Sequence, residues 1–88
     1  MAHTVTLTWQ DDGSATGGFN VYRGAAVGSE TKIASVAAGV LTYVDESPLA
    51  TDSYFVRAVA NGVESANSNE VTVSLPASAP TNLVAVVN

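Results

Sequence analysis

Apolar and polar residues alternate with a period of two along most of the chain, which is the pattern of half-buried β-strands. The alternation is strict from Thr4 to Trp9, where Val5, Leu7 and Trp9 share one face and threonines occupy the other. No stretch of helical length repeats apolar residues at spacings of three, four and seven. The pattern therefore predicts a protein built from strands, with Thr4–Trp9 as the first.

Five further strands are predicted from alternation and from β-branched or aromatic content. They span residues 19–23, 30–36, 40–44, 53–60 and 70–75. In the last of them, Val71, Val73 and Leu75 are expected to point inward. Asn61-Gly62 follows the richest strand and predicts a tight hairpin, because a type I′ turn needs positive φ at both central residues.

Short strands separated by turn signals, with no helix, favour an all-β antiparallel sandwich over any α/β arrangement. A small barrel fits the same periodicity. The length of 88 residues allows a single domain, because independent folding becomes marginal well below about 100 residues.

Four stretches resemble a fibronectin type III domain of the bacterial and phage kind, in the order of that family. They are His3–Trp9, Gly18–Gly24, Thr42–Asp45 and Val56–Glu70. The resemblance covers about residues 3–76 and implies an immunoglobulin-like sandwich, with strands A, B and E in one sheet and C, C′, F and G in the other. Tyr54 is the candidate for the tyrosine that anchors the corner before strand F, although the family register would place Asp52 there.

The chain departs from this family at its ends. Only two residues precede the strand B stretch, which leaves no room for strand A, while residues 79–87 look like the opening strand of such a domain. We therefore divide the chain into a sandwich, residues 1–76, and a tail, residues 77–88. Strand A is either missing or supplied by the C-terminal segment. The residues of the tail that are candidates for an assembly contact are Leu83, Val84, Val86 and Val87.

The tail has two possible explanations, and a third possibility is that it is simply a solvent-exposed chain end. In the first, the tail begins a following domain, and the chain is one repeat of a tandem array. In the second, the tail pairs with the exposed strand B edge of the next molecule.

Charge and composition exclude several classes of partner. Eight acidic residues against three basic ones give a net charge of −5, which argues against nucleic acid. The longest apolar run, residues 83–87, is too short for a membrane span, and no signal peptide precedes the first strand. The absence of cysteine excludes disulfides, thiolate nucleophiles and cysteine-ligated metals.

Catalytic chemistry has few candidates, so we expect no enzyme, cofactor or metal. His3 lies near the terminus, and Asp11-Asp12 and Asp45-Glu46 are expected to be solvated loop residues. A calcium site at Asp11-Asp12 lacks the alternate-residue ligand spacing of an EF-hand. Gly17-Gly18 is expected to be a flexible entry to the next strand rather than a phosphate loop, because no lysine or helix follows.

An exposed face is the better candidate site. If Phe19 and Val21 point inward, Tyr22 points outward, and by the same alternation Phe55 and Arg57 point outward from a neighbouring strand. Tyrosine and arginine are frequent at binding hot spots, so this face could bind a protein or a sugar. The alternative is cross-strand pairing that stabilises the sheet without a ligand.

We therefore expect a non-catalytic structural or interaction module. The first expectation is a phage virion accessory protein on a capsid or tail, binding itself or a coat protein. The alternative is a spacer or adhesion module from a secreted bacterial multidomain protein, such as a carbohydrate-active enzyme. Both place the protein outside the cell or on a virion surface.

Overall fold

Seven β-strands and no helix make up the part of the chain that the structure, a computed structural model, describes: residues 3–76 and 83–87. The strands are β1 (Val5–Thr8), β2 (Phe19–Gly24), β3 (Thr31–Val36), β4 (Thr42–Asp45), β5 (Thr51–Ala60), β6 (Val63–Glu64) and β7 (Val71–Ser74).

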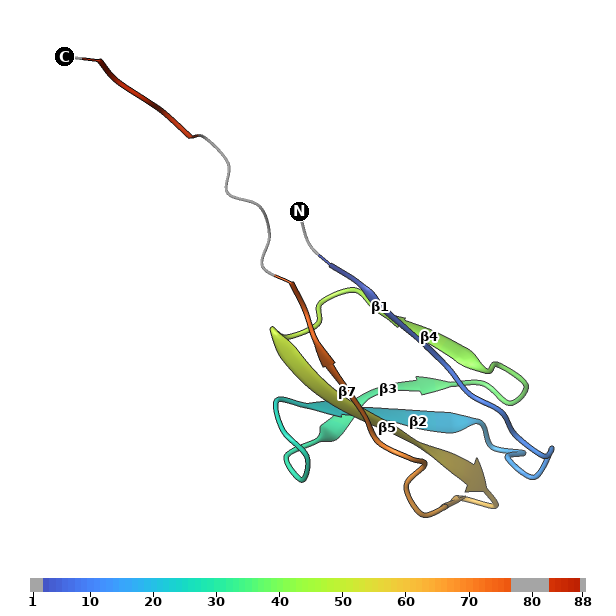
Figure 1. The fold of residues 1–88 in the computed structure, drawn as a ribbon. Coiled ribbons are helices and arrows are strands. Elements are labelled where there is room, and N and C mark those ends of the chain that lie inside the picture. The colour runs from blue at the N-terminus through green and yellow to red at the C-terminus, as the bar shows by residue number, and fades with distance from the viewer. Residues whose placement is uncertain (1–2, 77–82, 88) are drawn as a thin grey trace.

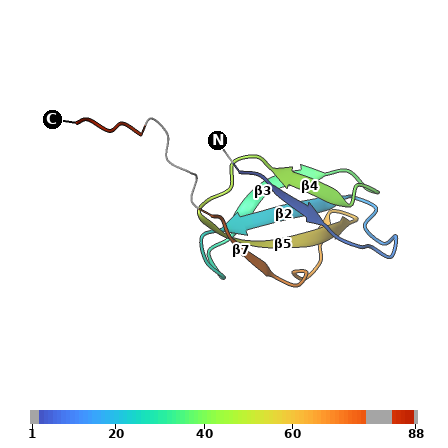
Figure 2. The same cartoon turned by 45° about the horizontal axis from the view of Figure 1, so that its top comes forward.

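The strands form two antiparallel layers (Figures 1 and 2). β1 pairs with β4 in the smaller layer, and the larger has the order β3-β2-β5, with β6 and β7 both pairing with β5. β7 pairs with the first residues of β5, and β6 with its last two. The predicted antiparallel sandwich is confirmed, and its two layers correspond to strands B and E and to strands C′, C, F and G.

The core lies between the layers, on the faces that alternation predicts. Val5 from β1, and Phe19 and Val21 from β2, are buried, and Val21 is completely inaccessible. Trp9 follows β1 and packs edge-on against Phe19, with ring centroids 5.4 Å apart. Trp9 is only half-buried, however, because it lies where the two layers are open to solvent.

The predicted hairpin after β5 is confirmed. Asn61 has a φ of 52° and Gly62 a φ of 76°, both positive, as the predicted type I′ turn requires. The turn brings Glu64 opposite Val59. This register puts Glu64 on the same side of the sheet as Arg57, because residues two apart on a strand share a face.

Within the described residues β1 pairs with β4 alone, so the smaller layer has two strands. A missing strand A is one of the two outcomes that the sequence predicts. One expectation about the edges needs correction. Val71 was predicted to point inward but is 46% exposed, while Val73 and Leu75 are half-buried. Val71 is exposed because it lines the opening beside β1, where no described strand covers it.

The loop before β2 is held in place by backbone hydrogen bonds, whereas its glycines were expected to make it a flexible connection to β2. Gly17 donates a backbone hydrogen bond to the Val59 carbonyl (2.8 Å), and Val59 donates one to the Gly18 carbonyl (2.9 Å). Gly18 has a φ of +90°, and a Cβ atom there would lie 2.2 Å from the Val36 carbonyl oxygen. Only glycine fits this position without moving backbone.

Gly18→Ala should therefore destabilise the sandwich by about 3 kcal/mol or more, because it adds a backbone clash to the cost of positive φ. Gly13→Ala is the matched control: its φ is +93°, but a Cβ there has open space. The control should lose only about 1 to 2 kcal/mol. Urea unfolding of the two variants measures the difference, and equal losses would show that the contact with Val36 does not matter.

Candidate functional site

The three residues predicted to form an exposed face do come together, on the outer side of the larger sheet. Tyr22 and Phe55 are directly opposite across β2 and β5, and their rings stack with centroids 4.7 Å apart and an interplanar angle of 14°. The Arg57 guanidinium lies 4.9 Å from the centre of the Tyr22 ring and 5.3 Å from that of Phe55.

The predicted exposure of Phe55 is wrong, because only 6% of this residue is accessible. Its ring is covered by the stacked ring of Tyr22 and by the guanidinium of Arg57. Tyr22 and Arg57 are half-buried. The face therefore offers a partner one partly accessible aromatic ring rather than two.

Glu64, which the sequence analysis missed, organises this face. Its Oε2 accepts hydrogen bonds from the hydroxyl of Tyr22 (2.6 Å) and from Nδ2 of Asn20 (2.7 Å). Its Oε1 accepts one from Nη1 of Arg57 (3.1 Å). Arg57 also donates from Nε to Oδ1 of Asn67 (2.8 Å). The predicted Asn61-Gly62 turn is the signal that could have placed Glu64 here, because a two-residue turn fixes the register of the hairpin.

These hydrogen bonds change the pKa values of Glu64 and Tyr22. The bonds from Tyr22 and Asn20, followed by Arg57, lower the pKa of Glu64 to about 2. The bond to Glu64 raises the pKa of Tyr22. At neutral pH the face therefore holds a carboxylate, a neutral phenol and a guanidinium that satisfy one another. This is the arrangement of cross-strand stabilisation, and binding through Tyr22, Phe55 and Arg57 stays a prediction.

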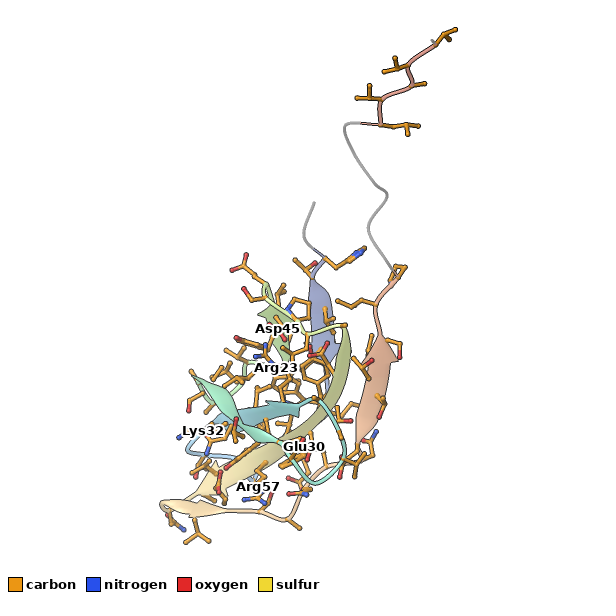
Figure 3. The ribbon with its side chains drawn as sticks, turned by 90° about the vertical axis from the view of Figure 1, so that its left-hand side faces the viewer. Arg23, Glu30, Lys32, Asp45 and Arg57 are labelled. Atoms are coloured by element: carbon orange, nitrogen blue, oxygen red, sulfur yellow. The ribbon has the colours of Figure 1, made fainter. Side chains whose placement is uncertain are left out.

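A second polar cluster lies between the two layers (Figure 3). Arg23 on β2 donates from Nη1 to both carboxylate oxygens of Asp45 on β4, at 2.9 and 3.1 Å. The Tyr54 hydroxyl donates to Oδ2 of Asp45 at 2.7 Å. Nε of Arg23 also lies 3.8 Å from the fully buried Asp52. The expectation that Asp45 is a solvated loop residue is therefore wrong, and Tyr54 is the residue whose hydroxyl is anchored.

The pKa values of this cluster reflect burial and pairing. Burial by itself would raise the pKa of Asp45, but the hydrogen bonds from Tyr54 and Arg23 outweigh it and lower that pKa. Burial and the bond to Asp45 raise the pKa of Tyr54. Perturbed groups mark functional sites when they line a cleft. The nearest groove is lined by Tyr54 but not by Arg23 or Asp45, so this cluster is a structural link between the layers.

The other candidate catalytic or metal-binding side chains lie within hydrogen-bonding distance of backbone atoms. Asp11 and Asp12 are exposed and accept hydrogen bonds from the amides of Gly13 (2.9 Å) and Ser14 (3.0 Å). His3 lies 3.0 Å from the Pro76 carbonyl oxygen. Among the described residues no three histidine, aspartate or glutamate side chains are grouped so as to hold a metal. The same residues contain no helix long and apolar enough to cross a membrane.

The four candidate assembly residues lie in the second described range, 83–87. Leu83 and Val87 are 94% and 97% exposed, and Val84 and Val86 are each 75% exposed. No strand is formed there. Most of the predicted tail, residues 77–82 and 88, lies outside the described residues.

Fold and geometry together define the class of this protein as a two-layered antiparallel β-sandwich module of the immunoglobulin-like kind. Residues 3–74 match the family model of the rhamnogalacturonan I lyases beta-sheet domain, so the chain belongs to that family. The more specific resemblance to fibronectin type III domains is not confirmed by this match. No curated protein and no solved structure matches the chain.

Asp45→Asn should destabilise the protein by about 3 kcal/mol at pH 7, because it removes the counter-charge hydrogen-bonded to the partly buried Arg23 and leaves only Asp52, at 3.8 Å. The folded pKa of Asp45 lies below its usual value of 3.8. Its contribution is therefore complete above about pH 5 and is lost as the pH falls through the folded pKa. Urea unfolding at pH 7 and at pH 2 to 3 should show the variant and the wild type converging in acid.

Glu46→Gln is the matched control, because Glu46 is the exposed neighbour of Asp45. It should change the free energy of unfolding by less than about 0.5 kcal/mol. If Asp45→Asn were as mild as this control, the buried ion pair would have no role in joining the layers.

Glu64→Gln should lower stability at pH 7 and flatten its dependence on acid. The folded pKa of about 2 lies below the usual 4.5, so the contribution of Glu64 is lost as the pH falls between these values. Thermal unfolding from pH 7 to pH 2 should show the two proteins converging over that range. Curves that stay parallel would contradict the proposed role of Glu64.

Proposed function

We propose that this protein is a non-catalytic accessory module of a larger secreted, polysaccharide-active protein, in which it acts as a spacer between other parts of the polypeptide. The observation that carries the proposal is the family match over residues 3–74, because that family is named as a β-sheet domain of rhamnogalacturonan I lyases. Its partners would then be neighbouring domains of the same polypeptide.

The contacts of three of the eight acidic residues, Asp45, Glu64 and Asp11, argue against a catalytic role for these three. A general base or acid must reach the proton that it transfers. Asp45 is buried against Arg23, Glu64 is held by three side chains, and Asp11 accepts a hydrogen bond from within its own loop. Asp45 and Glu64 do not line the hollows beside β1, and Asp11 lines an open surface hollow together with its sequence neighbour Asp12.

Charge favours a spacer over a tight binder of the polysaccharide. Rhamnogalacturonan carries uronic acid groups, and the module has a net charge of −5, so long-range electrostatics disfavour their association. The cations of the outer face are Arg57, already bonded to Glu64 and Asn67, and Lys32. A carbohydrate partner at this face is therefore the weaker proposal.

The family match favours this function over a virion accessory role, the first expectation from the sequence. The match names a domain of polysaccharide lyases and gives a capsid or tail role no support. The alternative expectation, a module of a carbohydrate-active enzyme, is the one we carry forward.

The purified chain should neither shorten rhamnogalacturonan I nor bind it. Reducing-end release measures cleavage, and isothermal titration calorimetry measures binding with a dissociation constant below about 1 mM. Cleavage by the chain would overturn the absence of catalysis. Saturable binding that Arg57→Ala abolishes, and that Lys32→Ala retains, would make the outer face a sugar-binding site and overturn the spacer role.

A further inference from the structure

An open groove runs between β1 and β7, on the side of the sandwich where the layers are not closed. It encloses about 360 Å³, and a second hollow of about 150 Å³ shares four of its lining residues and extends it. The shared residues are Trp9, Gln10, Val56 and Ser68. Figure 2 shows β5 running between β1 and β7.

The edge of β1 along this groove has free backbone groups. Trp9 donates its amide to the Leu41 carbonyl (3.1 Å), in line with the register that pairs Leu7 with Tyr43. Hydrogen-bonding directions alternate along an antiparallel strand, so the amides of Thr6 and Thr8 point away from β4. No strand of residues 3–76 or 83–87 pairs with that edge. An unpaired edge of this kind is a template for another strand.

The groove also exposes apolar surface that a strand would cover. Val71 is 46% exposed, and Trp9 and Leu7 are half-buried. The indole Nε1 of Trp9 is shielded from solvent and has no hydrogen-bond partner among the described residues. An occupant that supplies apolar side chains and a backbone edge would fit the groove.

The chain itself contains a segment of that chemistry. Residues 83–87 read Leu-Val-Ala-Val-Val, are apolar throughout and are rich in the β-branched residues that favour strands. The four large side chains are 75% to 97% exposed. Five extended residues span about 17 Å, the same as the five residues from Val5 to Trp9 along the edge.

Strand direction favours a second copy as the source of the segment. His3 lies 3.0 Å from the Pro76 carbonyl, so the chain leaves β7 at the end where β1 begins. A segment that turned back from Pro76 onto its own β1 would run parallel to it. A segment that arrives from another copy, at the end marked by Trp9, runs antiparallel, which is the slightly more stable pairing.

We propose that residues 83–87 of one copy add as an antiparallel strand to the free edge of β1 of a second copy, filling the groove beside Trp9 and Val71. This contact is heterologous, so each copy has one donor segment and one acceptor edge. Repetition gives open head-to-tail chains, or a ring if the geometry closes. The proposal concerns self-association and goes beyond the spacer function, which it does not require.

The test uses two full-length variants that each remove one half of the contact. Ala85→Pro removes a backbone donor in the middle of the donor segment. Thr8→Pro removes a donor from the free edge of β1, where proline is tolerated because that amide does not bond to β4. Ala85→Ser and Thr8→Ser are the matched controls, and far-ultraviolet circular dichroism verifies that every variant is folded.

Sedimentation velocity over a range of concentrations reads out the result. The wild type and both serine controls should grow beyond a dimer as concentration rises, while each proline variant alone should be a monomer. A mixture of the two proline variants should stop at a 1:1 dimer, because the Thr8→Pro chain keeps the donor and the Ala85→Pro chain keeps the acceptor.

Two outcomes would overturn the proposal. A wild type that is monomeric at every concentration would show that residues 83–87 do not pair between copies. Oligomers that persist in both proline variants would show that the copies associate through another surface, such as the exposed side chains of Val40, Leu41 and Val44. Neither result bears on the spacer function, which is tested by the polysaccharide assays.

Discussion

A buried ion pair holds together a sandwich with a small apolar core. Among the described residues, the buried apolar side chains are Val5, Ala15, Phe19, Val21 and Tyr54, with Phe55 buried separately on the outer face under Tyr22. Arg23 and Asp45 add a charge-assisted link from the larger layer to β4, and Tyr54 shares the same carboxylate. A buried charge is tolerated only when it is paired and hydrogen-bonded, so this link fixes how β4 lies on β2 and β5. The positions of β1 and of the groove beside it depend on that placement.

On the outer face of the larger sheet, paired and hydrogen-bonded polar groups also link strands, although these groups are partly exposed. Glu64 ties β6 to β2 through Tyr22 and to β5 through Arg57, and the stacked rings of Tyr22 and Phe55 cross the same two strands. Residue types that are common at hot spots are here bonded to each other. A face whose donors and acceptors are already satisfied gains little from a ligand, and this supports the proposed spacer role over the predicted binding at this face.

The surface with unsatisfied groups is elsewhere, at the free edge of β1. Natural sheet proteins usually protect such edges with charges, prolines or covering segments. Here the edge lies beside an apolar groove, and the same chain carries an exposed apolar segment of matching length. Membership of the lyase β-sheet domain family and self-association through this edge are compatible, because the family match describes the sandwich and the edge contact uses residues 83–87, beyond the matched range.

The sequence by itself determined six of the seven strands, all but β6, together with the Asn61-Gly62 turn and the inward faces of β1 and β2. A period of two and the φ preferences of single residues are local properties. The sequence also brought Tyr22, Phe55 and Arg57 to one face. Alternation assigns a side chain to a face but says nothing of what lies over it. Only the tertiary structure decided that Phe55 is covered by its neighbours, that Asp45 is buried against Arg23 and that Val71 stays open beside β1, because each depends on a contact between residues distant in the chain.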